Sequence, residues 1–378
     1  MNNMINFDNA ATTFPKPRTV RSAVDAAIAR YGGNPGRSGH ALSLRAAEKI
    51  FEVRTLAAEM FGAETENVAF TANSTFALNM AIKGIMQYGG HIIISSMEHN
   101  SVARPVYALS TSRGVTFSVA RVHENDDDTL RELESLIRPA TKCICFMAAS
   151  NVTGRIMPYK RIAELCRRRG LCFICDCSQG AGVLDISLKD GMNFICTSGH
   201  KSLYGPTGTG LLISDGEYPL STIIEGGTGA TSSSIEQTSF MPEKLESGTL
   251  NTVGIIGLGE GLKFVSSKGI ANIFAHESGL CERFIRRLSD RPDIKIYRGK
   301  GSFAPIVSFN IGAMSSHTVA AALSDRGFAL RGGLHCAPLA HNTIGTVEQG
   351  TVRFSPSVFN NASQTERLCD VILGIREN

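Results

Sequence analysis

The chain has 378 residues, of which 43% are hydrophobic and 19% charged, and its formal net charge is +4. This composition is ordinary for a globular protein, and the small net charge gives no sign of a nucleic-acid partner. No apolar run approaches the ~20 residues of a membrane helix, and the N-terminus lacks the pattern of a secretion signal, so we expect a cytoplasmic protein with no membrane association.

Helical and strand patterns alternate through the first half of the chain. The predicted helices cover residues 44–61, 76–85, 130–137 and 159–169. The predicted strands cover residues 68–71, 91–96, 115–119, 142–148, 171–176, 193–197 and 210–214. Continuous apolar strands between helices indicate a mostly parallel sheet that is covered on both faces. The predicted fold class is therefore an open α/β sheet.

The second half of the chain has a different pattern. A glycine-rich polar stretch at 225–234 predicts a long functional loop, and a helical stretch follows Asn251. Further helices are predicted at 270–288, at 316–326 and from Ser363, with strands near 294–297 and 304–309. We predict a large domain over residues 15–262, and a small α+β domain formed by residues 1–14 together with 263–378.

The ten cysteines need an explanation, because a reducing compartment keeps thiols free. Most of them lie in apolar runs, where cysteine acts as a small hydrophobic residue. The Cys-x-x-Cys at Cys172 and Cys175 has no second pair at zinc-finger spacing, so we expect no metal site. Cys336 differs, because it lies in the turn-like segment Arg-Gly-Gly-Leu-His-Cys-Ala-Pro.

Polar side chains follow the predicted strands, at the edge of the sheet where ligands bind in open α/β folds. They comprise an anion site at a helix start, an imidazole, an amide, a carboxylate with a glutamine, and a lysine in a glycine-rich turn. In chain order these are Ser74 and Thr75, His99, Asn151, Asp176 with Gln179, and Ser198 with His200 and Lys201. Any one of them alone could equally be a helix cap or a turn residue.

Together these groups match what pyridoxal phosphate requires. A lysine forms a Schiff base with its aldehyde, and a carboxylate keeps the pyridine nitrogen protonated so that the ring can accept electrons. An imidazole can stack on the ring, and hydroxyl groups at a helix N-terminus suit the phosphate. The sequence therefore predicts a pyridoxal 5'-phosphate site around Lys201.

Six short motifs, in their order and spacing, resemble those of class V aminotransferase-fold enzymes, and specifically of cysteine desulfurases. They are Asp8-Asn-Ala-Ala-Thr-Thr, Met97-Glu-His-Asn-Ser, Ser150-Asn-Val-Thr-Gly, Asp176-x-x-Gln179, Ser198-Gly-His-Lys201 and Glu246-Ser-Gly-Thr-Leu-Asn-Thr. The resemblance covers essentially the whole chain. It implies the PLP-dependent transferase fold (aspartate aminotransferase-like, fold type I), with a mostly parallel central sheet and a smaller α+β C-terminal domain.

The resemblance also implies a role for each matching residue. Lys201 corresponds to the Schiff-base lysine, Asp176 to the partner of the pyridinium nitrogen, and His99 to the stacking histidine that also moves protons. Gln179 corresponds to the residue that bonds the ring hydroxyl, and Asn151 to one beside the ring. The implied phosphate ligands are Ser74, Thr75, Ser198 and His200. Thr249 corresponds to a residue that reaches the phosphate of the other subunit, which implies a homodimer.

The C-terminal part carries the residues that distinguish reactions within this fold. Arg331, Cys336 and Arg353 lie in segments that we predict to be loops or sheet edges. An arginine fork suits the carboxylate of an amino acid. By resemblance, Arg353 is the carboxylate clamp, Arg331 a second substrate arginine, and Cys336 the thiol that takes sulfur from L-cysteine as a persulfide. We expect Arg331 and His335 to favour the Cys336 thiolate.

The short segment around Cys336 resembles group II (Suf-type) desulfurases and selenocysteine lyases, although Leu334 stands where these often have a histidine. The first interpretation is a cysteine desulfurase that makes L-alanine and passes sulfur to an acceptor protein or a small thiol. The alternatives are a selenocysteine lyase acting on L-selenocysteine, a cysteine C–S lyase, and a non-catalytic dimeric scaffold. Intact Lys201, Asp176 and Arg353 argue against the scaffold.

Overall fold

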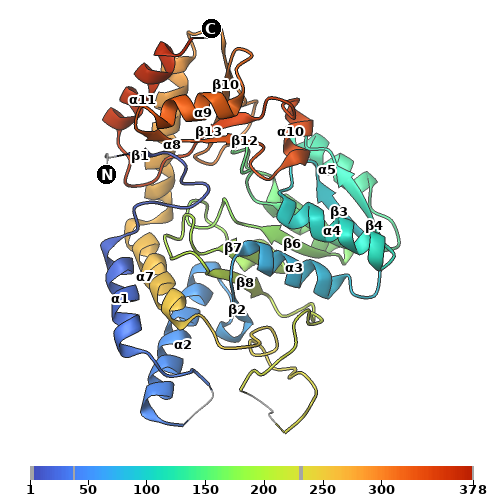
Figure 1. Cartoon of the computed structure of the whole chain (residues 1–378). Coiled ribbons are helices and arrows are strands. Elements are labelled where there is room, and N and C mark those ends of the chain that lie inside the picture. The colour runs from blue at the N-terminus through green and yellow to red at the C-terminus, as the bar shows by residue number, and fades with distance from the viewer. Residues whose placement is uncertain (1–3, 37–38, 230–232, 377–378) are drawn as a thin grey trace.

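The computed structural model describes residues 4–36, 39–229 and 233–376, so part of the predicted loop at 225–234 lies outside the described residues. The described chain folds into a large sheet with helices on both faces and a C-terminal lobe at one end of it (Figure 1). None of the described helices combines the length and the apolar character needed to span a bilayer.

The central sheet has seven strands in the order β2-β8-β7-β6-β5-β3-β4. They are β2 (Val68–Thr71), β3 (Gly90–Ser95), β4 (Val115–Ala120), β5 (Thr141–Met147), β6 (Cys172–Asp176), β7 (Phe194–Ser198) and β8 (Gly210–Ser214). Strand β8 is antiparallel to both neighbours, and every other neighbouring pair is parallel. The predicted α/β fold with a mostly parallel sheet is confirmed.

Successive residues of each strand face opposite sides of this sheet, so each strand contributes to two cores. Ile144 packs with helices on one face, whereas Cys143 and Cys145 pack with helices on the other. The first face is covered by α2 (Ala41–Phe61), α5 (Asp126–Ser135), α6 (Tyr159–Arg169) and α7 (Thr252–Lys268). The second is covered by α3 (Ser74–Ile85) and α4 (Asn100–Ser112). The cysteines of β5 and β6 are therefore core residues.

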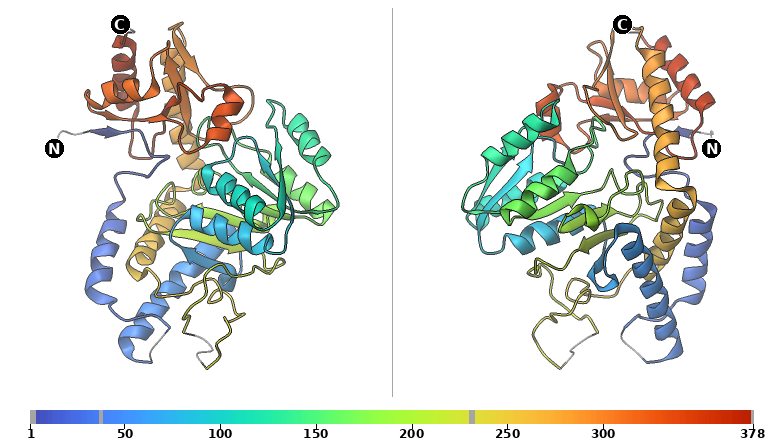
Figure 2. Two further views of the ribbon diagram at one scale, coloured as in Figure 1. Left: turned by 45° about the vertical axis from the view of Figure 1, so that its right-hand side comes forward. Right: turned by 180° about the vertical axis from the view of Figure 1, so that it is seen from behind.

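The C-terminal lobe has its own sheet and core (Figure 2). Its antiparallel sheet has the order β12-β13-β10-β9, formed by β9 (Ile294–Ile296), β10 (Val307–Ile311), β12 (Arg331–Gly333) and β13 (Thr351–Phe354). Its helices are α8 (Ile270–Leu288), α9 (Ser316–Ser324), α10 (Pro338–Ile344) and α11 (Ala362–Gly374). The N-terminal strand β1 (Ile5–Asn6) pairs in parallel with β11 (Phe328–Ala329), which joins the start of the chain to this lobe.

Three helices lack a counterpart in the sequence-based prediction, and one of them is the short α10. Helix α1 (Arg18–Arg30) packs along α7 and buries only Val20 and Ala27, so its sequence carries little apolar periodicity. Helix α4 contains Pro105, a residue that normally ends a helical pattern. Strand β10 begins at Val307 rather than at residue 304, because Pro305 cannot donate a ladder hydrogen bond.

Candidate active site

A cavity of about 280 Å³ lies where the central sheet meets the C-terminal lobe. Its walls come from the residues after β5, β6 and β7, the first turns of α3 and α4, the N-terminal segment, and β12 and β13. All the predicted site residues except Cys336 and Thr249 line it. Those that do are Ser74, Thr75, His99, Asn151, Asp176, Gln179, Ser198, His200, Lys201, Arg331 and Arg353.

One end of the cavity is the start of α3. Asn73 caps this helix by accepting a hydrogen bond from the Phe76 amide at 3.0 Å. The Ser74 amide donates to the Ser198 hydroxyl at 3.0 Å, and the hydroxyl groups of Ser74 and Ser178 lie 2.7 Å apart. Free amides, hydroxyl groups and the positive end of the helix dipole together suit a phosphate.

Asp176 ends β6 and carries a carboxylate into the cavity wall. Both the amide and the hydroxyl of Ser178 donate to its Oδ1, the amide at 2.9 Å. Within the described residues no hydrogen bond reaches its Oδ2. One carboxylate oxygen therefore remains for a protonated ring nitrogen. The supporting role of Ser178 was not predicted, although its spacing from Asp176 is typical of a side-chain-to-backbone turn.

Lys201 follows β7, and its Nζ makes no hydrogen bond with any described residue. Burial lowers the pKa of Lys201 to about 8, with the Asp176 charge opposing this and Arg353 and Arg331 adding to it. A lysine with such a pKa is partly unprotonated near neutral pH, and the unprotonated amine is the nucleophile.

His99 is the N-cap of α4, so its ring position is set by that helix. The Ser101 amide donates to Nδ1 at 3.1 Å, and the Ser101 hydroxyl lies 2.6 Å from the same nitrogen. Burial lowers the pKa of His99 to about 4. The ring is therefore neutral, and because Nδ1 accepts, its proton is on Nε2. Ser101 is a second supporting residue that the sequence-based prediction missed.

Arg353 lies on β13, and the prediction of a loop or edge position for it is wrong, because β13 is an interior strand flanked by β12 and β10. It is 1% exposed. Its Nη2 lies 2.8 Å from Oδ1 of Asp8, and its Nη1 donates to the Asn151 carbonyl at 3.0 Å. Arg331 is its partner in register on the edge strand β12, so the cavity wall carries two neighbouring guanidinium groups. Asp8, which balances part of this charge, was not among the predicted site residues.

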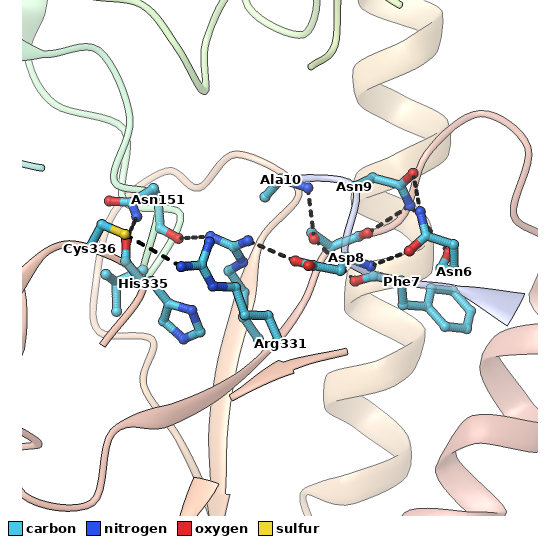
Figure 3. Close-up of polar contacts among 12 residues, drawn as sticks. Asn6, Phe7, Asp8, Asn9, Ala10, Asn151, Arg331, His335 and Cys336 are labelled. Atoms are coloured by element: carbon cyan, nitrogen blue, oxygen red, sulfur yellow. Dashed lines mark hydrogen bonds and ion pairs between the residues drawn. The ribbon is translucent and has the colours of Figure 1, made fainter. Parts of the chain in front are cut away.

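Cys336 lies beside the cavity in a short turn between β12 and α10 (Figure 3). It is exposed, whereas the other nine cysteines, all described, are buried. Arg331 Nη2 lies 3.4 Å from its Sγ. Two hydrogen bonds hold the backbone of this turn in place. Asn151 Nδ2 donates to the His335 carbonyl, and the Asn100 amide donates to the Cys336 carbonyl, both at 2.8 Å. His335 and Cys336 both have positive φ, a conformation that non-glycine residues rarely adopt.

The expectation that His335 supports a Cys336 thiolate is wrong. Burial lowers the pKa of His335 well below its usual value, and Arg353 adds to this effect. Its Nε2 lies 3.0 Å from both the carbonyl and the hydroxyl of Thr351, so the neutral ring donates there. Arg331 is thus the cation that faces the thiol.

Thr249 is the predicted residue that the structure does not bring to this cavity. Its hydroxyl accepts a hydrogen bond from Asn34 Nδ2 at 3.2 Å. Its predicted role involves a second subunit, so this placement within one chain leaves that role a prediction.

Four polar atoms around the cavity are buried and have no hydrogen-bond partner among the described residues: Asn151 Oδ1, His200 Nδ1, His335 Nδ1 and Arg353 Nε. Unpaired buried polar atoms are costly, so their concentration here fits a polar molecule in the cavity. The anion site, the carboxylate, the lysine and the imidazole fit the phosphate, ring nitrogen, aldehyde and ring face of pyridoxal phosphate. The described residues contain no group of histidine, cysteine and acidic side chains that could hold a metal ion.

Comparison with known proteins gives the family. The aminotransferase class-V family model matches residues 5–368. The chain belongs to that family. Members of the class-V aminotransferase family are pyridoxal phosphate-dependent enzymes, so the fold is that of fold type I transferases.

Several similar class-V proteins are named as cysteine desulfurases. A probable cysteine desulfurase of Mycolicibacterium paratuberculosis is 32% identical over 99% of this chain, but the chain spans only 56% of that protein's length. One from Xylella fastidiosa (strain 9a5c) is 31% identical, over 99% of this chain and 91% of its own. The chain thus belongs with the cysteine desulfurases of the class-V family. The apo structure of the cysteine desulfurase from Thermococcus onnurineus NA1 aligns with a TM-score of 0.90 and 29% identity, covering 98% of this chain and 94% of its own.

Proposed function

We propose that this protein is a pyridoxal phosphate-dependent cysteine desulfurase, which converts L-cysteine to L-alanine and takes the sulfur onto Cys336 as a persulfide. The observation that carries the proposal is an exposed thiol, held 3.4 Å from an arginine and next to a cavity lined by lysine, carboxylate and imidazole groups. The names of similar proteins support the same reaction.

In this proposal the start of α3 holds the cofactor phosphate, with Ser74, Thr75, Ser198 and His200 as its ligands. Gln179 would contact the ring hydroxyl, and Asp176 Oδ2 would keep a proton on the ring nitrogen. Pyridoxal phosphate, when bound, supplies an electron sink for the negative charge that develops beside the substrate α-carbon.

Lys201 and His99 then have separate roles. The unprotonated Lys201 amine would hold the cofactor through its aldehyde, and Nζ is the group placed to carry a proton next to the substrate. His99 would stack on the cofactor ring, and its Nε2–H would be a hydrogen-bond donor on that side of the cavity. The Ser101 contacts keep Nδ1 as the acceptor, which fixes this tautomer.

Arg353 and Arg331 would hold the substrate carboxylate, and Arg353 Nε has no hydrogen-bond partner among the described residues. The carbon–sulfur bond of L-cysteine breaks, its carbon takes a proton, and a sulfur–sulfur bond forms at Cys336. Cysteine and the enzyme thiol thus give alanine and an enzyme persulfide, with no further oxidant. Arg331 Nη2 lies 3.4 Å from Sγ of Cys336, and the nucleophile in the sulfur transfer is this thiol in its thiolate form.

The test is incubation of the purified, cofactor-loaded protein with L-cysteine, followed by measurement of alanine, pyruvate, sulfide and the mass of the Cys336 peptide. We expect alanine and a gain of one sulfur atom on Cys336. Cys336→Ser should bind cysteine with a spectral change yet make neither persulfide nor alanine from cysteine. Cys166→Ala, at a buried helical thiol, is the matched control and should retain activity.

Native alanine production by Cys336→Ser would contradict the persulfide step. Pyruvate and free sulfide as main products would indicate a C–S lyase. Faster turnover of L-selenocysteine than of L-cysteine would indicate a selenocysteine lyase. The homodimer in which Thr249 reaches the other subunit, the sulfur-acceptor protein or small thiol, and the domain boundaries all stay predictions.

A further inference from the structure

The carbonyl of His200, next to Lys201, is crowded by donors from one N-terminal turn. Around its oxygen lie the Thr13 amide at 3.1 Å, the Thr13 and Thr12 hydroxyl groups at 3.2 Å, and Lys16 Nζ at 2.7 Å. A carbonyl oxygen has two lone pairs, so this number of close donors is unusual.

The Thr13 hydroxyl links the same turn to the Lys201 backbone. Its Oγ1 lies closer to the Lys201 carbonyl, at 2.9 Å, than to that of His200. Lys16 Nζ in turn lies 2.6 Å from Thr13 Oγ1. A hydroxyl has one proton, so Thr13 accepts from Lys16 and donates to the Lys201 carbonyl. The Lys16 ammonium thus contacts the His200 carbonyl directly and the Lys201 carbonyl through Thr13.

Lys16 is placed unlike an ordinary surface lysine. It is partly buried, and burial lowers its pKa to about 8. Within the described residues it has no carboxylate partner, and its hydrogen-bond acceptors are the His200 carbonyl and the Thr13 hydroxyl. Buried cations are normally paired with anions, because removing a charge from water is costly. The cost of this arrangement suggests that the contacts themselves are useful.

The turn that carries Lys16 also contacts the rest of the cavity wall. Ala10 and Ala11 line the cavity, and the Ala10 carbonyl accepts a hydrogen bond from Gln179 Nε2 at 3.0 Å. Asp8, just before them, pairs with Arg353 (Figure 3 shows the contacts around Asp8 and Ala10). The turn therefore lies between the substrate arginine and the lysine that carries the cofactor in the proposed function.

We propose that Lys16 is a positioning residue: with Thr13, it fixes the backbone of His200 and Lys201 and so the place of the Lys201 amine in the cavity. The inference rests on the proposed function, because it assigns Lys16 a role through Lys201. Side chains that react must be held to within a fraction of an ångström, so a backbone released at Lys201 slows chemistry without removing any group that touches substrate.

The experiment compares Lys16→Met and Lys16→Arg with Lys263→Met, a control at an exposed lysine that pairs with Glu260 on the helix surface. For Lys16→Met we expect kcat to fall about 10- to 100-fold, with the KM for cysteine within about twofold because Arg353 is untouched. Lys16→Arg keeps the charge and the donors, so it should recover most of kcat.

A second readout does not depend on turnover. Apoprotein is mixed with pyridoxal phosphate, and the rate at which the visible absorbance of the bound cofactor appears is measured. Borohydride reduction and peptide mass then show whether Lys201 is labelled. Lys16→Met should reconstitute more slowly than wild type and than Lys263→Met, since the Lys201 amine is less well placed.

The outcomes separate this inference from the proposed function. If wild-type protein is not labelled at Lys201, the proposed function is wrong and the inference falls with it. If wild type is labelled and active but Lys16→Met matches the Lys263→Met control in kcat and reconstitution rate, only the role of Lys16 is wrong. The role of Lys16 is also wrong if the fall in kcat of Lys16→Met is no larger than the fall in the fraction of its molecules that carry cofactor. Should Lys16→Met fail to fold, Thr13→Val takes its place with the same expected and contradicting results.

Discussion

A buried ion pair holds the segment that leads to Thr249, and its removal gives a sharp prediction. Arg54 on α2 and Glu246 are 6% and 8% exposed. The two side chains meet in a bidentate pair, with Nη1–Oε1 at 2.7 Å and Nη2–Oε2 at 2.8 Å. The Phe70 amide on β2 donates to the same carboxylate at 2.7 Å. Glu246 thus joins the loop after residue 233 to a helix and a strand of the large sheet.

Glu246→Gln keeps the size of the side chain but leaves the Arg54 cation buried without its counter-ion. Breaking one side of such a pair costs about 3–5 kcal/mol of unfolding free energy. The matched control is Glu52→Gln, whose partner Lys49 lies on the same helix at the surface. An exposed pair of this kind contributes about 0.5 kcal/mol or less.

The assay is urea unfolding followed by far-ultraviolet circular dichroism, because the chain has no tryptophan to report by fluorescence. For a chain of this size we expect the Glu246→Gln midpoint to fall by about 1 M or more, and the Glu52→Gln midpoint to change little. The double variant Arg54→Met/Glu246→Leu removes both charges and should recover much of the loss. A Glu246→Gln midpoint equal to that of the control would refute the reasoning.

Two further predictions concern the substrate site and the effect of pH. Arg353→Lys keeps a charge but loses the planar fork, so the KM for cysteine should rise about 10- to 100-fold, with the cofactor spectrum unchanged. Steady-state kinetics test this, with Arg326→Lys as the control. A native KM in Arg353→Lys would remove Arg353 from the site. Glu277 is buried with its Oε1 3.2 Å from the Tyr204 hydroxyl, and burial raises its pKa from 4.5 to about 8. Since the folded state holds this proton more tightly, the stability that Glu277 contributes is complete below pH 4.5 and is lost as the pH rises towards 8. The free energy of unfolding of wild type relative to Glu277→Gln, measured by urea unfolding, should therefore fall between pH 5 and pH 8 by at most about 1.4 kcal/mol per pH unit. A constant difference would show that Glu277 is already charged.

Most of the central sheet and the composition of the candidate site could be predicted from the sequence. Apolar runs bounded by polar residues mark buried strands, and ligands bind where such strands end. Asp176 and Lys201 could therefore be placed in one site because each follows a predicted strand. The cysteines of β5 and β6 could be assigned to the core for the same reason. These properties are local, because each is set by a few successive residues.

Other features depend on residues that are distant in the chain, and only the tertiary structure decided them. Arg353 is separated from Asp8 by 345 positions, and nothing near either residue indicates their ion pair. Likewise Lys16 and His200 are 184 positions apart. Such contacts follow from the pairing of β1 with β11 and from the position of β13 inside its sheet, which the local pattern of apolar residues does not specify.

Two of the three helices without a sequence-based counterpart, α1 and α4, follow the same division. Helix α1 is held by its packing along α7, and α4 continues through Pro105 because its apolar residues Val102, Val106 and Leu109 are buried against the sheet. Local sequence signals report what a segment prefers in isolation, whereas burial against a distant partner contributes more free energy than that preference. The sequence by itself therefore determined which residues could do the chemistry, and the tertiary contacts decided how the N-terminal turn, β13 and the Cys336 turn hold them in place.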